Sequence, residues 1–284
     1  MSAAATMSAM QEARDYLRRL AGRAVEPDAP SGMVWRCWGS GPDLLLLHGG
    51  YGSWRHWARV IEPLGSRYRL LVPDMPGFGD SPDAPADWTE DSLAATLVAD
   101  MESLGIERLH AIAGFSFGGI IAGHVAAHLG DRIDHLLLIG PNGLGQPYND
   151  IDDVRRPTKD MDEEEIAGVH RHNLLQIMLH RPESANDLAV AIQMDNAAAA
   201  RARTTGIPES DSLFQVLPRI TARLHGLWGE EDAFATGMVD GRETLLRSFQ
   251  SDLRFHRLPA TGHWVPFEAP EETVRTVLGL ADPV

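Results

Sequence analysis

The sequence predicts an α/β fold, with a mostly parallel central sheet that is flanked by helices. Short apolar runs of strand length alternate along the chain with longer segments whose apolar residues recur every three or four positions. This alternation stops after Gly140 and resumes near residue 218, with only helical patterns between. Neither flanking part could complete a sheet alone, so we expect one sheet with a helical insertion rather than two tandem domains.

The composition excludes several classes of protein. Hydrophobic residues make up 44% of the chain and charged residues 23%, which are ordinary values for a domain with a full core. The formal net charge of −15 argues against binding to nucleic acid or to an anionic membrane surface, since both need clustered positive charge. The N-terminus lacks the pattern of a secretory signal, and no apolar run could span a bilayer. We expect a cytoplasmic protein with a small-molecule substrate.

The elements are expected in a regular order. Residues 1–30 form an N-terminal extension, in which an amphipathic helix at about 10–25 packs on the domain or on a partner subunit of a homodimer. Strands are then expected from Met33 and at 44–47, 70–72, 109–113, 136–139, 224–228 and 253–258, with helices at 53–64, 92–104, 119–129, 241–249 and 270–280.

These elements divide the chain into a core and an insertion. Residues 31–140 and 218–284 carry the alternating strands and helices of the α/β core. Residues 141–217 contain two helical patterns, near 166–179 and 183–203, and no convincing strand. We therefore expect the insertion to form a helical cap, or lid, over the core.

The sharpest local pattern is Gly114-Phe115-Ser116-Phe117-Gly118, where a predicted strand runs directly into a predicted helix. A serine at the tip of such a turn is pushed out of the sheet, and small residues on both sides let the backbone pass. The N-terminus of the helix adds a positive dipole and free N–H groups beside the hydroxyl. The pattern predicts that Ser116 is a nucleophile, the alternative being an ordinary glycine-rich turn.

A serine nucleophile needs a base, and the base needs an acid to orient it. His263 follows the last predicted strand in a turn, where it could reach the carboxyl edge of the sheet, whereas most other histidines lie in predicted helices or strand interiors. The acid is expected between the two along the chain, after an intervening strand, where Glu230-Glu231-Asp232 stands. Asp232 is the preferred acid and Glu231 the second choice, unless all three carboxylates are merely solvated.

The glycines after His48 could supply hydrogen-bond donors. Gly49-Gly50-Tyr51 follows the first buried strand, so the backbone N–H of Gly50, or less favourably of Tyr51, could hold an anionic intermediate together with that of Phe117. A phosphate-binding loop is the weaker interpretation, because no Gly-Lys-Ser/Thr follows.

Ser116, Asp232 and His263, in this order, resemble the α/β-hydrolase superfamily. The turn at 73–81 (PDMPGFGDS) is similar to the superfamily's D-x-P-G-x-G-x-S turn, and the stretch at 262–271 is similar to its C-terminal signature. The resemblance implies the α/β-hydrolase fold with a cap inserted after the sixth strand, a Ser-His-Asp mechanism, and neither a metal nor an organic cofactor.

Within this superfamily, a serine at position 116 argues against the dehalogenase and epoxide hydrolase branches, whose nucleophile is a carboxylate. We expect a serine hydrolase of small carboxylic esters or related acyl compounds. The resemblance extends to the meta-cleavage product hydrolases, which break carbon–carbon bonds. That family usually has Asn in place of Phe115 and an arginine in place of Gln193, a role that Arg201 or Arg203 could fill. A third hypothesis is a non-catalytic ligand receptor on the same fold, which the intact triad disfavours.

The sequence also predicts the surroundings of several further side chains. The substrate pocket is expected to be lined by Tyr51, Phe115, Leu174, Met178, Met194 and Trp264, although those in the cap could equally form its core. His170 and His172 have the spacing of a metal-binding pair but are better interpreted as surface residues. Cys37, the only cysteine, lies in an alternating stretch and is expected to be a buried strand residue.

Overall fold

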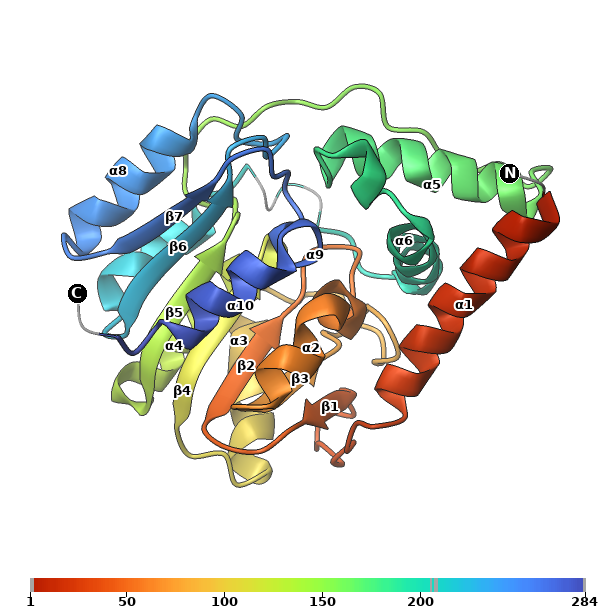
Figure 1. Cartoon of the computed structure of the whole chain (residues 1–284). Coiled ribbons are helices and arrows are strands. Elements are labelled where there is room, and N and C mark those ends of the chain that lie inside the picture. Colours follow the sequence, from red (N-terminus) through yellow and green to blue (C-terminus); the bar gives the residue numbers. More distant parts are fainter. Residues whose placement is uncertain (1–2, 205, 207–208, 283–284) are drawn as a thin grey trace.

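A computed structural model describes residues 3–204, 206 and 209–282 of the chain. Over these residues, seven strands form one sheet in the order β1-β3-β2-β4-β5-β6-β7 (Figure 1). β1 runs antiparallel to β3, and all other neighbouring strands are parallel. The strands are β1 (Trp35–Trp38), β2 (Asp43–Leu47), β3 (Arg69–Pro73), β4 (Leu109–Phe115), β5 (Ile133–Ile139), β6 (Arg223–Gly229) and β7 (Arg254–Leu258). The predicted mostly parallel sheet is confirmed.

Helices cover both faces of the sheet (Figure 1). One face packs against α3 (Glu90–Ser103), α4 (Phe117–Leu129) and α8 (Val239–Phe249), with the short α7 (Ser212–Val216) against α4. The other face packs against α2 (Ala58–Gly65), α9 (Val265–Glu268) and α10 (Pro270–Leu278). The fold is therefore a three-layer α/β/α arrangement, as the alternating pattern predicts.

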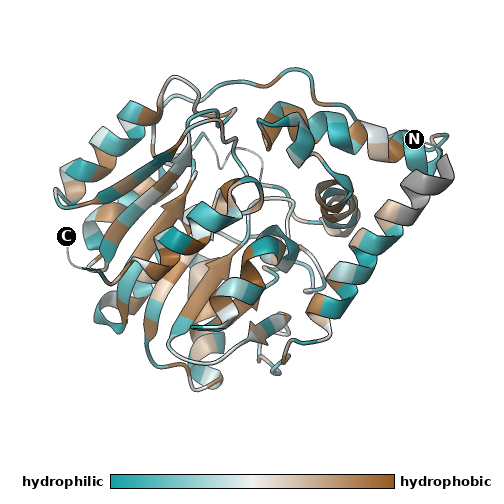
Figure 2. Cartoon of the chain, in the orientation of Figure 1, coloured by the Kyte–Doolittle hydropathy of each residue, from teal (hydrophilic) through white to brown (hydrophobic). Residues whose placement is uncertain are grey.

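The continuous apolar runs form strands because both of their faces are buried. In β2, Leu44 and Leu46 belong to one core cluster and Leu45 and Leu47 to the other, and all four are fully buried. Each such leucine contributes roughly 1.5–3 kcal/mol relative to an exposed one. Figure 2 shows the hydrophobic colour concentrated on the strands between the helical layers.

Three α-helices of the described chain lie between β5 and β6. The short α7 packs against α4, and we call the other two the cap helices: α5 (Glu163–Ile177) and α6 (Asp187–Ala199). The superfamily resemblance put the insertion after the sixth strand, whereas it follows the fifth strand of this sheet. The count is one lower because the described chain before β1 contributes only an isolated bridge, between Val25 and Cys37, and no further strand.

The N-terminal helix α1 (Ala3–Ala21) is longer than the sequence pattern predicts. It packs along α6, and Arg14 Nη1 lies 2.7 Å from a carboxylate oxygen of Glu163 at the start of α5 (Figure 1). Its buried side includes Leu17 and Leu20. α1 therefore connects the cap helices with the edge of the sheet near β1.

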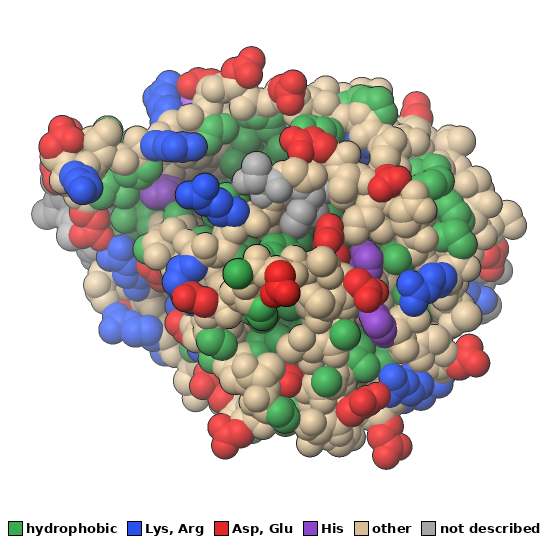
Figure 3. All heavy atoms as spheres, turned by 180° about the vertical axis from the view of Figure 1, so that it is seen from behind, with side chains coloured by type: hydrophobic (Ala, Val, Ile, Leu, Met, Phe, Trp, Pro, Cys, Tyr) green, Lys and Arg blue, Asp and Glu red, His purple; other side chains and the backbone are tan. Residues whose placement is uncertain are grey.

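The molecule has a face of mixed charge (Figure 3), and its one thiol is partly buried. On the face seen in Figure 3, acidic and basic side chains are interspersed. Within the described ranges, no helix combines the length and apolarity needed to cross a membrane. Cys37 is half-buried in β1, and burial raises the pKa of its thiol to about 11. Its thiolate form is therefore scarce at neutral pH.

Candidate active site

Ser116 stands at the tip of the turn between β4 and α4. Its φ of 52° and ψ of −121° are rare for a residue with a side chain, a strain that typically costs about 1–3 kcal/mol. The flanking glycines make the turn feasible, because a Cβ at Gly114 would lie 2.4 Å from the Gly118 carbonyl oxygen and one at Gly118 would lie 2.2 Å from that of Leu47. The hydroxyl is thereby held at the carboxyl edge of the sheet.

His263 and Asp232 form a buried pair. His263 Nδ1 donates to Asp232 Oδ2 at 2.8 Å, and each side chain is only 2% exposed. The other carboxylate oxygen of Asp232 accepts the Phe234 N–H at 3.0 Å, which orients the acid. Because Nδ1 carries the proton, His263 Nε2 is free to accept one. Glu231, the second-choice acid, is exposed.

Ser116 and His263 line one cavity of about 730 Å³. No hydrogen bond joins the Ser116 hydroxyl to the His263 ring in the described part of the chain. Such bonds are often long before a substrate binds, so both groups remain a workable nucleophile and base. Phe115 keeps the imidazole close to the serine turn, since the Phe115 and His263 ring centroids are 5.0 Å apart.

The loop after β2 supplies candidate donors to the same cavity. Gly50 and Phe117 both line it, and neither backbone N–H has a hydrogen-bond partner among the described residues. His48 fixes the peptide before Gly50. Its Nε2 accepts the Met75 N–H at 2.9 Å, so Nδ1 carries the proton and donates to the Gly49 carbonyl at 2.8 Å. Tyr51, at φ 52°, also lines the cavity and is 46% exposed.

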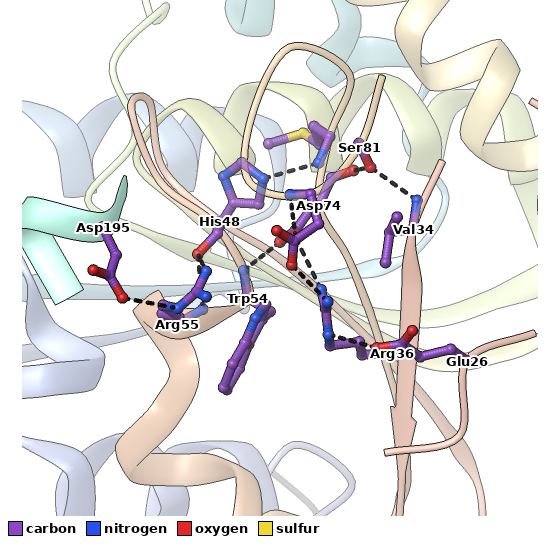
Figure 4. Close-up of polar contacts among 12 residues, drawn as sticks. Glu26, Val34, Arg36, His48, Trp54, Arg55, Asp74, Ser81 and Asp195 are labelled. Atoms are coloured by element: carbon purple, nitrogen blue, oxygen red, sulfur yellow. Dashed lines mark hydrogen bonds and ion pairs between the residues drawn. The ribbon is translucent and has the colours of Figure 1, made fainter. Parts of the chain in front are cut away.

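The turn at 73–81 braces this loop through Asp74, which is fully buried (Figure 4). Asp74 Oδ1 accepts the Trp54 N–H at 2.7 Å, and Oδ2 accepts from Arg36 at 2.9 Å. Arg36 also pairs with Asp80 at 2.7 Å and with Glu26 at 2.9 Å. These contacts tie the turn to β1 and to the start of the helical segment that follows the loop after β2.

The cap closes the cavity from the opposite side. Its lining there combines apolar side chains with several positive or polar ones, namely Arg155, Arg156, His170, Asn173, Ile177, Met178, Gln193, Ala197 and Arg203. His170 is 8% exposed, and its Nδ1 lacks a hydrogen-bond partner among the described residues. Burial lowers the pKa of His170, so its ring is neutral at neutral pH. Three arginines thus line this cavity in an acidic protein, and one of them, Arg155, is paired with Asp153 at 3.5 Å.

Three of the six expected pocket residues lie elsewhere. Tyr51, Phe115 and Met178 line the cavity, but Leu174, Met194 and Trp264 do not. Leu174 is fully buried and Met194 packs against the same apolar cluster, because the faces of α5 and α6 that carry them turn toward the cap core. Trp264 stacks on Phe267 at 4.3 Å and donates its indole N–H to the His56 carbonyl at 3.0 Å.

Sequence reasoning missed the arginines at 155 and 156. They precede α5 in a segment without helical or strand periodicity, and Asn173 holds that segment by accepting the Arg155 N–H at 2.9 Å. The only available signal was a basic pair within an acidic stretch. His172 contacts Asp153 and not His170, and the described residues contain no cluster of three or more potential metal ligands.

A buried contact joins the loop after β2 to the cap. The Ser53 hydroxyl donates to Asn196 Oδ1 of α6 at 2.6 Å, and both side chains are fully buried. Gln193, one turn earlier on α6, reaches the cavity lining. One face of α6 therefore meets both the cavity and the loop that carries Gly50.

Comparisons with known proteins agree with this fold. A family model described as alpha/beta hydrolase fold matches residues 42–177. The chain is 27% identical over 256 residues to a 2-hydroxy-6-oxo-6-phenylhexa-2,4-dienoate hydrolase of Comamonas testosteroni, covering 84% of this chain and 87% of that one. A pimeloyl-[acyl-carrier protein] methyl ester esterase of Vibrio vulnificus is 35% identical over 105 residues, or 37% and 39% of the two chains. A membrane phospholipase A, described as a bacterial virulence factor, superposes with a TM-score of 0.70 at 25% identity, covering 98% and 92%.

Proposed function

Because the chain belongs to the α/β-hydrolase fold superfamily, we propose that it is a serine hydrolase of a small carboxylic ester or a related acyl compound. The observation that carries this proposal is that Ser116 and His263 line one cavity while Asp232 holds the imidazole from behind at 2.8 Å. The backbone N–H groups of Gly50 and Phe117, which have no hydrogen-bond partner among the described residues, line the same cavity.

In the proposed mechanism, Ser116 Oγ attacks the carbonyl carbon of the substrate and its proton passes to His263 Nε2. Asp232 stabilises the imidazolium, and the N–H groups of Gly50 and Phe117 bind the negative oxygen of the tetrahedral intermediate. The intermediate collapses, His263 protonates the departing alcohol, and the acyl group stays on Ser116. Water, deprotonated by His263, then attacks the acyl carbon; the bond from this carbon to Ser116 Oγ breaks, the acid leaves, and His263 returns the proton to Oγ.

The cavity supports a substrate with a negatively charged group. Arg155, Arg156 and Arg203 line it, and guanidinium groups form strong paired hydrogen bonds with carboxylates. We expect monoesters of dicarboxylic acids to show a lower KM than neutral esters of equal length. Arg203→Gln should raise KM for the acidic ester and leave that for the neutral one nearly unchanged, whereas equal changes for both would contradict a charge-recognition role.

A carbon–carbon hydrolase is the second candidate, because the relative from Comamonas testosteroni covers most of the chain and is named for a dienoate substrate. The same serine, histidine and oxyanion donors could serve that reaction. Phe115 before the nucleophile and Gln193 in the cavity lining depart from the meta-cleavage pattern and favour the ester reaction.

The decisive experiment compares wild type with Ser116→Ala on two substrates. Release of p-nitrophenol from p-nitrophenyl butyrate reports ester hydrolysis, and loss of the yellow colour of a ring-cleavage dienoate reports carbon–carbon hydrolysis. We expect ester turnover by the wild type and a fall of at least about 10³-fold in the variant. Equal background rates for both proteins on both substrates would contradict the proposal and favour a receptor.

A further inference from the structure

We propose that His56 is a positioning residue that holds the oxyanion loop in the geometry required for hydrolysis, an inference that rests on the function proposed above. His56 lies in the 3-10 turn Trp54–Trp57 and is 2% exposed. Its Nδ1 accepts the Gly49 N–H at 3.2 Å. His56 is not among the described residues that line the cavity, so its role is to act through Gly49.

The reason lies in the peptide planes on either side of Gly49. A glycine rotates freely about φ and ψ, so both planes need an external partner. His48 holds the plane that follows, by donating to the Gly49 carbonyl at 2.8 Å, and His56 holds the plane that precedes, by accepting the Gly49 N–H. In a trans peptide the Gly49 carbonyl and the Gly50 N–H point in opposite directions. Holding both planes therefore keeps the Gly50 N–H directed away from His48, as an oxyanion donor requires.

The His56 ring is itself held in place. Its centroid lies 5.4 Å from that of Phe115, beside the nucleophile, and 5.0 Å from that of Trp264, beside the catalytic histidine. A Cβ at Gly52 would lie only 2.2 Å from His56 Cε1, so the glycine leaves the space that the ring occupies. The ring thus links the oxyanion loop to the neighbours of both Ser116 and His263.

The ring must stay neutral for this role, because a protonated Nδ1 cannot accept a hydrogen bond. Burial, together with the nearby His48 and His263, holds the pKa of His56 well below its usual value. The hydrogen bond therefore persists across the pH range in which a serine hydrolase with a histidine base is active.

Three substitutions separate the acceptor from the packing. His56→Phe keeps a ring against Phe115 and Trp264 but has no acceptor, and His56→Leu lacks both. His56→Asn loses the ring but offers an amide oxygen at the position of Nδ1. His128→Asn, on the outer side of α4, is the matched control for loss of a histidine. Rates are measured with p-nitrophenyl butyrate and normalised to folded protein by tryptophan fluorescence.

We expect kcat to fall about 10- to 100-fold in His56→Phe and His56→Leu with KM within about threefold, since loss of one oxyanion donor costs about 10²–10³ in kcat. His56→Asn should recover most of the rate. An alkylboronic acid forms a tetrahedral anion on a serine, so its Ki should rise in His56→Phe and His56→Leu in proportion to their fall in kcat. Equal kcat in His56→Phe and wild type, or an equal loss in His56→Asn and His56→Phe, would overturn the inference. Failure of the proposed function is distinguishable, because wild type and Ser116→Ala would then show the same background rate.

Discussion

Asp74 offers the sharpest test of how the fold supports the site. It is fully buried, and its two oxygens accept the N–H groups of Trp54 and Asp80 and the Arg36 guanidinium (Figure 4). In Asp74→Asn, Oδ1 still accepts from Trp54, but the new NH2 group faces two donors at the position of Oδ2. A buried pair that loses one partner costs about 3–5 kcal/mol. Arg36 keeps Asp80 and Glu26 as partners, so we expect the free energy of unfolding to fall by the lower end of this range, about 3 kcal/mol.

Urea unfolding followed by tryptophan fluorescence measures this loss, and thermal unfolding should show a fall in Tm of about 6–12 °C. Asp80→Asn is the matched control, because Asp80 pairs with the same arginine but its side chain is 51% exposed. Exposed pairs contribute about 0–1 kcal/mol, so this variant should remain close to wild type. A loss below about 1 kcal/mol in Asp74→Asn, or equal losses in the two variants, would refute the reasoning.

Three further predictions concern single groups. Asp232→Asn should reduce kcat by about 10⁴-fold, because an amide favours the wrong tautomer of His263; ester kinetics within tenfold of wild type would exclude Asp232 as the orienting acid. Burial, with His135 and nearby arginines, lowers the pKa of His225 to about 3. Between pH 6.5 and about 3, His225 is therefore protonated in the unfolded chain and neutral in the folded one. Stability is then lost as pH falls, by about 2 kcal/mol at pH 5, and urea unfolding at pH 7.5 and 5 should show a smaller loss in His225→Asn than in wild type. Cys37, with its raised pKa, should react with a thiol reagent far more slowly in the folded protein than in urea, and equal rates would contradict its burial.

The fold could be predicted from the sequence because the pattern of apolar residues along the chain follows their burial. The run at Leu44–Leu47 has no polar residue on either face, which is typical of a strand buried between two helical layers. The Ser116 turn was readable for a related reason, since two close backbone contacts force glycine at positions 114 and 118. Local sequence carries both kinds of constraint.

The features that local sequence does not predict depend on contacts between distant segments of the chain. The sequence pattern favours Asp232 over Glu231, but the structural reason is which carboxylate the chain reversal after β6 turns toward His263. The segment with Arg155 has no periodic pattern, and its position follows from Asn173 on α5. The number of strands before the insertion was taken from the superfamily, and the described residues contain one fewer.

The hydrogen bond between Ser53 and Asn196 couples the position of α6 to that of the loop after β2. Ser53 follows Gly50 by a few residues, so an outward swing of α6 would pull on the donor loop through a buried contact at 2.6 Å. Entry of a bulky substrate and alignment of the N–H groups that we propose as oxyanion donors would then be mutually exclusive. Turnover would be confined to the shut form, and bond cleavage would wait until the entrance had closed behind the substrate.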